Sequence, residues 1–220
     1  MTAAGASTLS EAASKELLAA HGIPFAPERL VTGPDEAVAA ADELGFPVVA
    51  KLNGDAIAHK TERGLVRLGL DGAAAVEVAA TELLAAARPE DGDVGVLVAP
   101  MVRGARELIA GLHRDPQFGL TVMLGLGGIL AEAVGRVAFR MVPLERVDAE
   151  ELLDDLELSA LLGPVRGEAP VDRAAVADLV LALAAFGEAE AAVASVDLNP
   201  VLITTDGRPV AVDALVELSA

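Results

Sequence analysis

Short apolar segments of strand length alternate with helix-length segments along this 220-residue chain. A strand or an amphipathic helix must bury its apolar face against another element, so such an alternation favours layers of helices packed on sheets. The first half reads as two successive β-α-β units, and the second half reads as strands, two helices and a closing hairpin. The pattern predicts an α/β protein built from two α+β lobes.

Several predicted elements have recognisable start and stop signals. Thr8-Leu9-Ser10-Glu11 has the pattern of a capping box before the first helix, and Pro34 and Gly45 bracket the second. The periodicity predicts helices at about 9–21, 34–45, 73–87, 148–157 and 172–187. It predicts strands at about 47–52, 65–70, 94–99, 106–112, 120–124, 137–142, 193–203 and 209–217.

Composition narrows the classes of partner. The chain has 16 Lys and Arg against 34 Asp and Glu, a formal net charge of −18, which disfavours nucleic acid and anionic membranes. It has no Cys, Trp or Tyr, so it has no thiolate metal site and almost no base-stacking surface. No uncharged apolar stretch is long enough to span a membrane, and the N-terminus lacks the pattern of an export signal. We therefore expect a cytoplasmic protein that binds neither nucleic acid nor membrane.

The clearest local signal is the turn Thr204-Thr205-Asp206-Gly207 between two apolar runs, because Asp-Gly is typical of a tight β-hairpin. A turn centred there places Asn199 opposite Asp213 to within a residue, and Asp197 on the same face as Asn199. Three hard oxygen ligands would converge, which suits Mg²⁺ held together with phosphate oxygens. The alternative is that Asp197 and Asn199 are ordinary polar residues at a strand end.

A lysine and a polar loop in the first half form a second candidate site. Lys51 ends the apolar strand PVVAK, where its ammonium group either meets an anion such as phosphate or extends to solvent. Gly64 follows the polar loop 53–63, whose backbone N–H groups can bind phosphate. His59 lies in this loop as a proton shuttle, a nucleophile or a surface residue. The residues alone predict a phosphate and Mg²⁺ site between the lobes.

Ten motifs, taken in order, resemble the ATP-grasp domain of NDP-forming acyl-CoA synthetases. They are SKELLAAHGIP, FPVVAKL, AHKTERGLV, LVAPMVRGARELIAG, DPQFG, MLGLGGILAE, FRMVPL, LLGPVRG, VDLNPVLI and VAVDA. The family includes the ADP-forming acetate-CoA ligases and is related to the β subunit of succinyl-CoA synthetase. The resemblance implies one ATP-grasp domain over residues 1–220. In it, ATP or ADP would be held between lobe 1, about 22–99, and lobe 2, about 1–21 plus 100–220.

The same resemblance assigns roles in nucleotide binding. Lys51 matches the lysine that contacts the nucleotide phosphates, and Gly64 belongs to the loop that cradles them. Glu107 matches an acidic residue close to the nucleotide, and Arg140 matches an arginine that faces phosphate. The hinge whose backbone recognises adenine corresponds to Val98, Ala99, Pro100 and Met101.

The resemblance also implies a reaction that runs through phosphohistidine, acyl-CoA + ADP + Pi ⇌ carboxylic acid + CoA + ATP. His59 matches the second histidine of the ADP-forming branch, which relays phosphate to ADP. Asp197 matches the carboxylate that orients and stabilises a phosphohistidine. Asn199 and Asp213 match the Mg²⁺ ligands.

Two parts of a complete enzyme have no counterpart in the sequence: a CoA-binding Rossmann unit and the loop that carries the first phosphohistidine. The resemblance therefore implies a separate β-type subunit or a cut-out domain, active only in a hetero-oligomer with an α-type partner that carries both. Two alternatives stay open. One is an ATP-grasp carboxylate-amine ligase that works through an acylphosphate, and the other is a regulatory module without catalysis.

Overall fold

The computed structural model describes residues 7–57, 60, 63–128, 135–157, 159–165 and 167–219. The chain divides into two compact units, which are described separately. Unit 1 comprises Met1–Ser7, Ser14–Phe25 and Val102–Ala220, and unit 2 comprises Thr8–Ala13 and Ala26–Met101.

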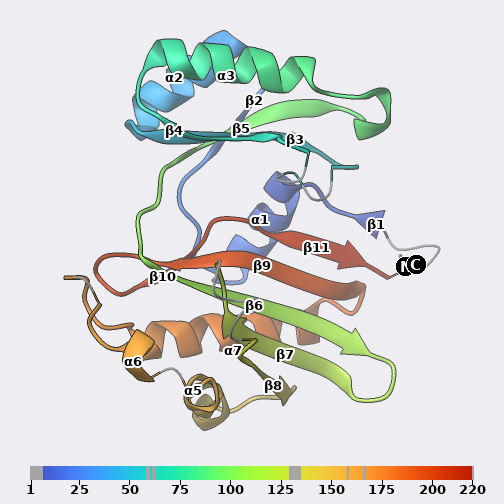
Figure 1. The fold of residues 1–220 in the computed structure, drawn as a ribbon. Coiled ribbons are helices and arrows are strands. Elements are labelled where there is room, and N and C mark those ends of the chain that lie inside the picture. Colours follow the sequence, from blue (N-terminus) through green and yellow to red (C-terminus); the bar gives the residue numbers. More distant parts are fainter. Residues whose placement is uncertain are drawn as a thin grey trace. The chain divides into compact units, whose positions relative to one another are not determined.

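The sheet of unit 2 has the strand order β2-β5-β3-β4, and every neighbouring pair is antiparallel. Its strands are β2 (Arg29–Val31), β3 (Val48–Gly54), β4 (Val66–Leu70) and β5 (Val94–Pro100). Helices α2 (Pro34–Leu44) and α3 (Ala73–Ala85) cover one face of this sheet (Figure 1), and the short 3₁₀ helix η1 (Pro89–Asp91) precedes β5. The two predicted β-α-β units are thus parts of one antiparallel sheet, and the three-residue strand β2 has no counterpart in the prediction.

Strand β3 is buried along its whole length. Its residues Ala50 and Leu52 belong to the apolar core that α2 and α3 close. Because successive side chains of a strand point to opposite faces, Lys51 and Asn53 lie on the other face of the sheet. The strand continues to Gly54, so Lys51 lies inside it and not at its end.

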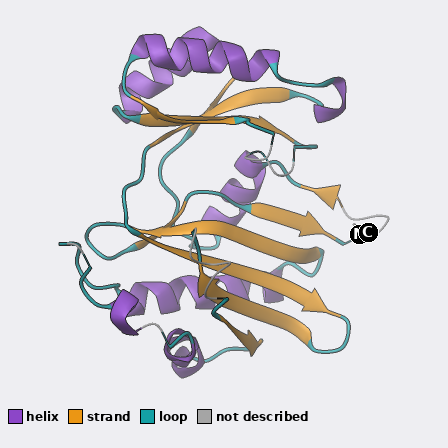
Figure 2. Cartoon of the chain, viewed as in Figure 1, coloured by secondary structure: helices purple, strands orange, loops and turns teal. Residues whose placement is uncertain are grey.

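The larger sheet has the strand order β1-β11-β9-β6-β7-β8, with β10 paired to β9. Its strands are β1 (Ser7–Thr8), β6 (Arg106–Asp115), β7 (Gly119–Leu126), β8 (Val137–Met141), β9 (Val193–Ile203), β10 (Pro209–Ala211) and β11 (Leu215–Leu218). Elsewhere in the described residues, the helices are α1 (Glu11–Ala20), α5 (Arg146–Asp155), α6 (Ser159–Leu162) and α7 (Arg173–Ala189). Figure 2 shows α5 and α7 on one side of this sheet, where α7 packs on β6 and β7 and α5 packs on β8.

Close packing of α7 defines the two faces of the larger sheet. A Cβ atom added at Gly187 of α7 would lie 2.7 Å from a methyl carbon of Leu112 and 2.8 Å from one of Leu120. A side chain at this position would require Leu112 and Leu120 to move, so glycine lets the helix lie close to the sheet as it stands. Leu112 of β6 faces α7, and successive residues of a strand point to opposite faces. The odd-numbered residues of β6, such as Glu107 and Gly111, therefore point away from α7. We call the side turned away from α5 and α7 the opposite face.

Helix α1 begins at Glu11, later than the capping-box pattern predicts. The Ser10 hydroxyl oxygen accepts a hydrogen bond from the N–H of Ala13 at 3.3 Å, and Asn53 Oδ1 accepts one from the N–H of Ala12 at 3.0 Å. These bonds satisfy two of the donors that a helix start leaves unpaired. The Glu11 carboxylate binds two lysines, as described below.

Across the described part of the chain, no helix combines the length and the apolar character needed to cross a membrane.

Candidate functional site

The closing hairpin places two candidate metal ligands opposite each other. Strand β10 pairs with β9 as far as Ala211 opposite Val201, and β11 continues in the same register from Leu215. Because the register is the same before and after Asp213, this residue lies opposite Asn199. The register that the Asp-Gly turn predicts is therefore present.

Gly207 fixes that register through the turn. Its N–H donates to the Thr204 carbonyl at 2.8 Å, and its φ of 93° is a left-handed conformation that favours glycine. A Cβ atom added there would lie 2.2 Å from the carbonyl oxygen of Pro170. Backbone conformation and space both require glycine at this position.

A β-bulge lies in β9 at the candidate ligands. The register between β9 and β6 shifts between Leu108 and Ala110, so Asn199 and Pro200 together stand where regular pairing would place one residue. Asp197 and Asn199 are both exposed, and the residue between them is buried. The two polar side chains therefore share the opposite face, as predicted.

The donor set at this place fits a hard divalent cation. Asp213 Oδ1 accepts a hydrogen bond from the N–H of Ala214 at 2.9 Å, which orients the carboxylate. Asn199 can supply an amide oxygen across the hairpin. Within the described ranges, no cluster of three or more His, Asp or Glu side chains could hold a metal unaided. One carboxylate and one amide oxygen suit Mg²⁺ when phosphate oxygens complete its coordination.

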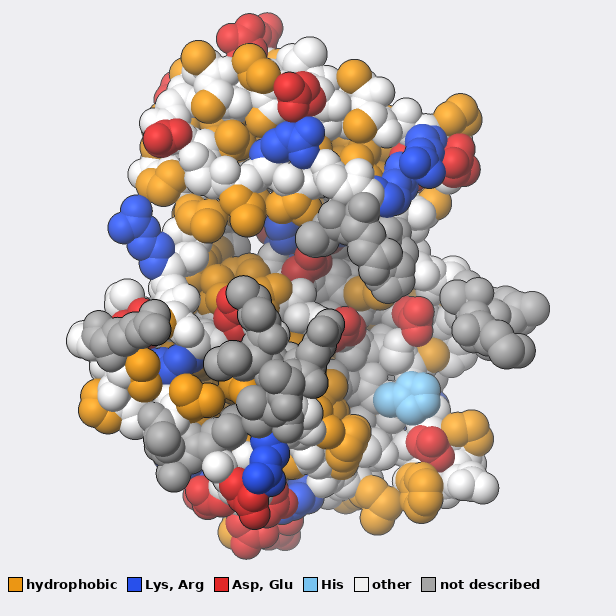
Figure 3. Space-filling view, viewed as in Figure 1, with side chains coloured by type: hydrophobic (Ala, Val, Ile, Leu, Met, Phe, Trp, Pro, Cys, Tyr) orange, Lys and Arg blue, Asp and Glu red, His pale blue; other side chains and the backbone are white. Residues whose placement is uncertain are grey.

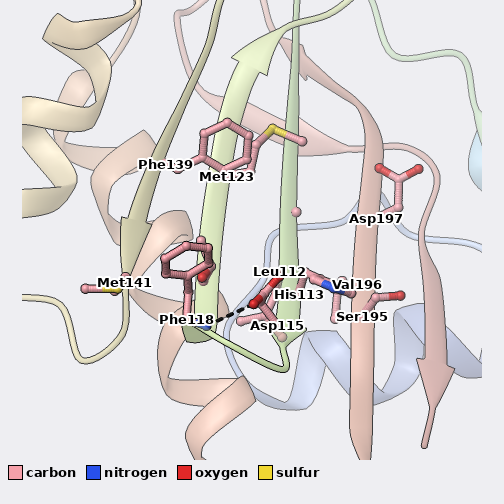
Figure 4. Close-up of a pocket in the computed structure, with 12 residues that line it drawn as sticks. Leu112, His113, Asp115, Phe118, Met123, Phe139, Met141, Ser195, Val196 and Asp197 are labelled. Carbon is pink, nitrogen blue, oxygen red and sulfur yellow. Dashed lines mark hydrogen bonds between the residues drawn. The ribbon is translucent and has the colours of Figure 1, made fainter.

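A cavity of about 590 Å³ lies on the opposite face beside Asp197 (Figure 4). Phe118, Phe139 and Met141 line it and are 67%, 57% and 62% exposed. Figure 4 shows Phe139 beside Met123 on the neighbouring strand, and Asp197 projecting from β9 at the rim. Exposed aromatic and methionine side chains that cluster around a cavity are typical of an interaction site.

We call this cavity and its lining the Asp197 groove, and the sequence prediction does not include it. The sequence does contain a signal for the groove, because the chain has only five Phe and two of them line it. In β8, large apolar residues also alternate with Ala138 and Arg140. Alternation normally indicates that the apolar side faces the core, and here that side is exposed.

Arg140 lies on the helix-covered face, and its role as a phosphate-facing residue stays a prediction. It pairs across the sheet with Val122, whose side chain is fully buried. Its guanidinium group forms ion pairs with Asp155 at 2.7 Å and Glu151 at 3.8 Å, both in α5. In Figure 3, basic and acidic side chains gather over this end of unit 1. Two carboxylates on the helix hold the arginine away from the face that carries Asp197.

Glu107 lies on the opposite face, beside the glycine-rich turn that follows β7. Its carbonyl oxygen accepts a hydrogen bond from the N–H of Gly127 at 2.8 Å. The side chain lines a second cavity of about 230 Å³ together with Gly128 and Leu126. Glu107 and Asp197 are thus on the same face of one sheet, and they line different cavities.

Lys51 is buried in unit 2 and is paired. Its Nζ donates to Glu11 Oε1 at 2.7 Å, and Lys60 Nζ donates to Glu11 Oε2 at the same distance. The Glu11 side chain is completely buried, and the Lys51 and Lys60 side chains are 10% and 8% exposed. The alternative in which Lys51 extends to solvent is therefore wrong.

Arg63 and Gly64, which follow His59 in the sequence, form hydrogen bonds within unit 2. His59 itself lies outside the described residues. The Arg63 guanidinium donates from two nitrogens to the two carboxylate oxygens of Asp91, at 2.7 and 2.9 Å. Gly64 follows, and its carbonyl oxygen accepts a hydrogen bond from Arg67 at 2.7 Å. Paired N–H groups of this kind form a strong and directional contact with a carboxylate.

The Arg63–Asp91 contact predicts a pH dependence of stability. The guanidinium holds the pKa of Asp91 at about 2, below its usual 3.8. A lowered pKa in the folded state stabilises the protein above pH 3.8, and this contribution is lost as the pH falls towards 2. We expect Asp91→Asn to lower the urea midpoint near neutral pH, with the difference from the wild type shrinking below pH 3.8. Urea unfolding followed by circular dichroism measures it, and a difference independent of pH would contradict this assignment.

The predicted hinge coincides with the end of β5 and of unit 2. Val98, Ala99 and Pro100 pair with β3, and the N–H of Met101 donates to the Pro47 carbonyl at 2.9 Å. The Met101 donor is therefore used within unit 2. Recognition of adenine by this segment would fall to its other backbone groups.

The family model for the ATP-grasp domain matches residues 1–218. This chain belongs to the ATP-grasp family. This chain is 35% identical over 221 residues to subunit beta of the ADP-forming acetate-CoA ligase II of Pyrococcus furiosus. The match covers 98% of this chain and 94% of that subunit. It is 38% identical over 197 residues to the ADP-forming acetate-CoA ligase I of Archaeoglobus fulgidus, which covers 88% of this chain but 29% of that longer protein.

Solved structures agree with the family assignment. The dinucleotide forming acetyl-coenzyme A synthetase 1 of Ca. Korarchaeum cryptofilum, in complex with coenzyme A and Ca-AMPCP, is 35% identical. Its TM-score with this ATP-grasp domain is 0.89, over 96% of this chain and 93% of that chain. In a structure of the same synthetase with coenzyme A and Mg-AMPPCP, at a TM-score of 0.83, the phosphohistidine segment points towards the nucleotide binding site. The predicted ATP-grasp fold and the predicted family are confirmed.

Proposed function

We propose that this ATP-grasp domain is the nucleotide-binding subunit of an ADP-forming acyl-CoA ligase, which catalyses acyl-CoA + ADP + Pi ⇌ carboxylic acid + CoA + ATP. The observation that carries the proposal is that Asp197 and Asn199 share the opposite face of β9, and that the hairpin register puts Asp213 opposite Asn199. A carboxylate and an amide there suit Mg²⁺ and nucleotide phosphates, and the carboxylate of Asp197 is proposed to contact a phosphohistidine. The match to a ligase β subunit over nearly its full length supports the same function.

The roles of individual side chains follow the chemistry of phosphoryl transfer. The neutral imidazole of His59 would attack the phosphorus of a phosphohistidine on the partner. One P–N bond forms as the other breaks, and the partner histidine leaves. A β-phosphate oxygen of ADP would then attack the phosphorus on His59, and the P–N bond to His59 would break, so that the imidazole leaves and ATP forms. Lys51 would contact the nucleotide phosphates, and Asp197 would orient the incoming histidine.

The Asp197 groove supports a place for the partner. A segment that brings a phosphohistidine to Asp197 must lie against the surface around that residue. The surface there is apolar and aromatic, with Phe118, Phe139 and Met141 exposed. The proposed occupant is therefore the segment of an α-type partner that carries the phosphohistidine, docked through apolar side chains beside the histidine.

The lengths of the relatives support a partner chain. The domain spans most of the P. furiosus β subunit but 29% of the A. fulgidus single-chain ligase. In that longer protein, most of the chain lies outside the matched domain. We propose that an α-type subunit supplies the CoA site and the first phosphohistidine, and that the assembled enzyme works in the cytoplasm.

The test is reconstitution of the full chain with its α-type partner, followed by measurement of the products. We expect ATP to form from ADP and phosphate only when acyl-CoA and both chains are present. ADP release with an amide product in the absence of CoA would contradict the proposal and support a carboxylate-amine ligase. Nucleotide binding without phosphoryl transfer in the complex would contradict it in favour of a regulatory module.

A further inference from the structure

Strand β8 is the last strand of the larger sheet, where it lies at the edge (Figure 1). Among the strands of the described residues, only β7 pairs with it. The edge of a sheet presents a row of backbone N–H and C=O groups that can pair with a strand of another chain. The side of β8 turned away from β7 is therefore a candidate place for strand addition.

The register with β7 decides which residues of β8 present their backbone groups at this edge. Next to β8, the N–H of Val142 donates to the Leu120 carbonyl at 2.8 Å, and the N–H of Leu126 donates to the Arg136 carbonyl at 3.1 Å. In an antiparallel pair, residues that share hydrogen bonds alternate with residues that do not. The even-numbered residues of β8 therefore bond to β7, and the odd-numbered ones direct their N–H and C=O groups to the open edge.

The odd-numbered residues also carry the large apolar side chains of β8. They are Val137, Phe139 and Met141, and all three are exposed on the opposite face. The Phe139 carbonyl accepts a hydrogen bond from Arg140 Nη1 at 3.0 Å, and its second lone pair can accept another. Natural edge strands are usually protected against pairing by charged side chains or proline. In β8, each outward residue instead offers a neighbouring strand both its backbone and an apolar side chain.

The charges beside β8 discriminate between a second copy of this chain and a different protein. Helix α5 packs on β8 and presents four exposed carboxylates, those of Glu150, Glu151, Asp154 and Asp155. Arg140 and Arg173 pair with three of them, so this surface keeps a net negative charge. Pairing of two β8 strands about a twofold axis would bring two such helices side by side, and like charges across an interface oppose binding. A strand with basic side chains towards α5 is favoured instead.

We propose that β8 accepts an extended segment of the α-type partner as an added strand, apolar on the side of Phe139 and basic on the side of α5. This inference rests on the proposed function, in which the partner docks at the Asp197 groove, because Phe139 and Met141 line that groove. In strand addition, main-chain hydrogen bonds supply affinity and alternate side chains supply specificity. The added strand would anchor the partner next to the groove.

The sheet order sets the distance between this anchor and the proposed phosphohistidine contact. Strands β7 and β6 lie between β8 and β9, which carries Asp197. At about 4.8 Å per strand, an added strand would lie about 19 Å from β9. An extended chain covers this distance in about six residues. The phosphohistidine is therefore expected about six or more residues away from the added strand along the partner chain.

Hydrogen–deuterium exchange of the wild-type chain, resolved by residue with NMR, tests the added hydrogen bonds without any substitution. In the free chain, we expect fast exchange at the N–H groups of Val137, Phe139 and Met141, and slow exchange at Ala138, which bonds to β7. With the α-type chain used for reconstitution, exchange at the three outward N–H groups is expected to slow about a hundredfold or more. Unchanged exchange in the complex would overturn the proposal. Slow exchange at these groups in the chain alone would also overturn it, because the edge would then be paired already.

Two substitutions of Phe139 separate the backbone from the side chain. Phe139→Ala removes the apolar contact, and we expect the affinity for the α-type chain, measured by calorimetry, to fall about tenfold. Phe139→Pro also removes the outward N–H, which an edge strand tolerates because that group does not bond within the sheet. We expect a further loss of about tenfold. Equal affinities of the two variants would show a side-chain contact without strand addition and would overturn the proposal.

Leu68→Ala is the matched control, because Leu68 is an exposed apolar residue in β4, the edge strand of the smaller sheet. We expect its affinity for the α-type chain to stay within about twofold of the wild type, and a loss as large as in Phe139→Ala would overturn the proposal. Far-UV circular dichroism checks the fold of each variant. If Phe139→Pro does not fold, the exchange measurement on the wild-type chain decides.

The same experiments distinguish this inference from the proposed function. If the wild-type chain and the α-type chain do not associate or form no ATP together, the proposed function fails. If they associate and form ATP while the outward N–H groups of β8 exchange as in the free chain, only strand addition fails.

Discussion

Replacing His59 by Asn is expected to reduce ATP formation by the reconstituted enzyme by about a thousandfold or more, because Asn cannot form the phosphorylated intermediate on which the relay depends. Asn keeps hydrogen-bonding capacity and similar volume, so the substitution removes the nucleophile with little change of shape. The affinity for ADP is expected to change by less than about twofold, since the nucleotide phosphates are assigned to Lys51 and to the Mg²⁺ site. Steady-state assays measure the rate of ATP formation, and calorimetry on the same preparation measures the affinity for ADP.

The chain supplies a matched control for this experiment. His21 follows α1, and its ring meets the edge of Phe186 with centroids 5.0 Å apart. His21→Asn makes the same chemical change at a histidine with no role in transfer, so turnover is expected to stay within about twofold of the wild type. Normal turnover by His59→Asn would remove the histidine relay from the account and favour the acylphosphate chemistry of a carboxylate-amine ligase.

The second large effect is expected from Asp213→Ala, which removes the carboxylate of the candidate Mg²⁺ site. With Mg²⁺ present, the affinity for ADP is expected to fall about tenfold or more, because the cation loses its charged protein ligand. With EDTA in place of Mg²⁺, variant and wild type are expected to bind ADP similarly. The loss should therefore depend on Mg²⁺, which a general defect of the hairpin would not show.

Asp206→Ala is the matched control for the metal site. Asp206 is an exposed carboxylate in the turn of the same hairpin, where it accepts a hydrogen bond from the Thr204 hydroxyl. The substitution removes the same charge from the same hairpin, and it is expected to leave the Mg²⁺ dependence of ADP binding unchanged. A loss of equal size in both variants would trace the effect to net charge or hairpin stability and would contradict the metal site.

Local signals predict the hairpin well. An Asp-Gly turn fixes the strand pairing on either side of it, and the predicted register of Asn199 and Asp213 is the observed one. The bulge at Asn199 and Pro200 depends on the pairing of β9 with β6, far away in the sequence, so no local pattern contains it. The bulge does not separate the two polar side chains, and the predicted face therefore remains correct.

The errors share a physical cause, which is competition from distant partners. The capping-box pattern assigns the Glu11 carboxylate to its own helix end, but two buried ammonium groups bind it more strongly than a backbone N–H would. The ion pairs of Arg140 also come from distant residues, because both carboxylates belong to α5. In the sequence, Lys51 has the appearance of a strand end because Asn53, which belongs to the last part of β3, is polar. The burial of Asn53 depends on the start of α1, where its side chain accepts a hydrogen bond.

The measurement that tests the central claim most directly is a calorimetric titration of the full chain with ADP, with and without Mg²⁺. The chain has no Trp or Tyr, so heat is a better signal than intrinsic fluorescence. The account predicts saturable, one-to-one binding of ADP that Mg²⁺ strengthens, and its loss in Lys51→Ala and Asp213→Ala. Binding that is indifferent to Mg²⁺ and to both substitutions would contradict the assignment of this chain as the nucleotide-binding subunit of an ADP-forming ligase.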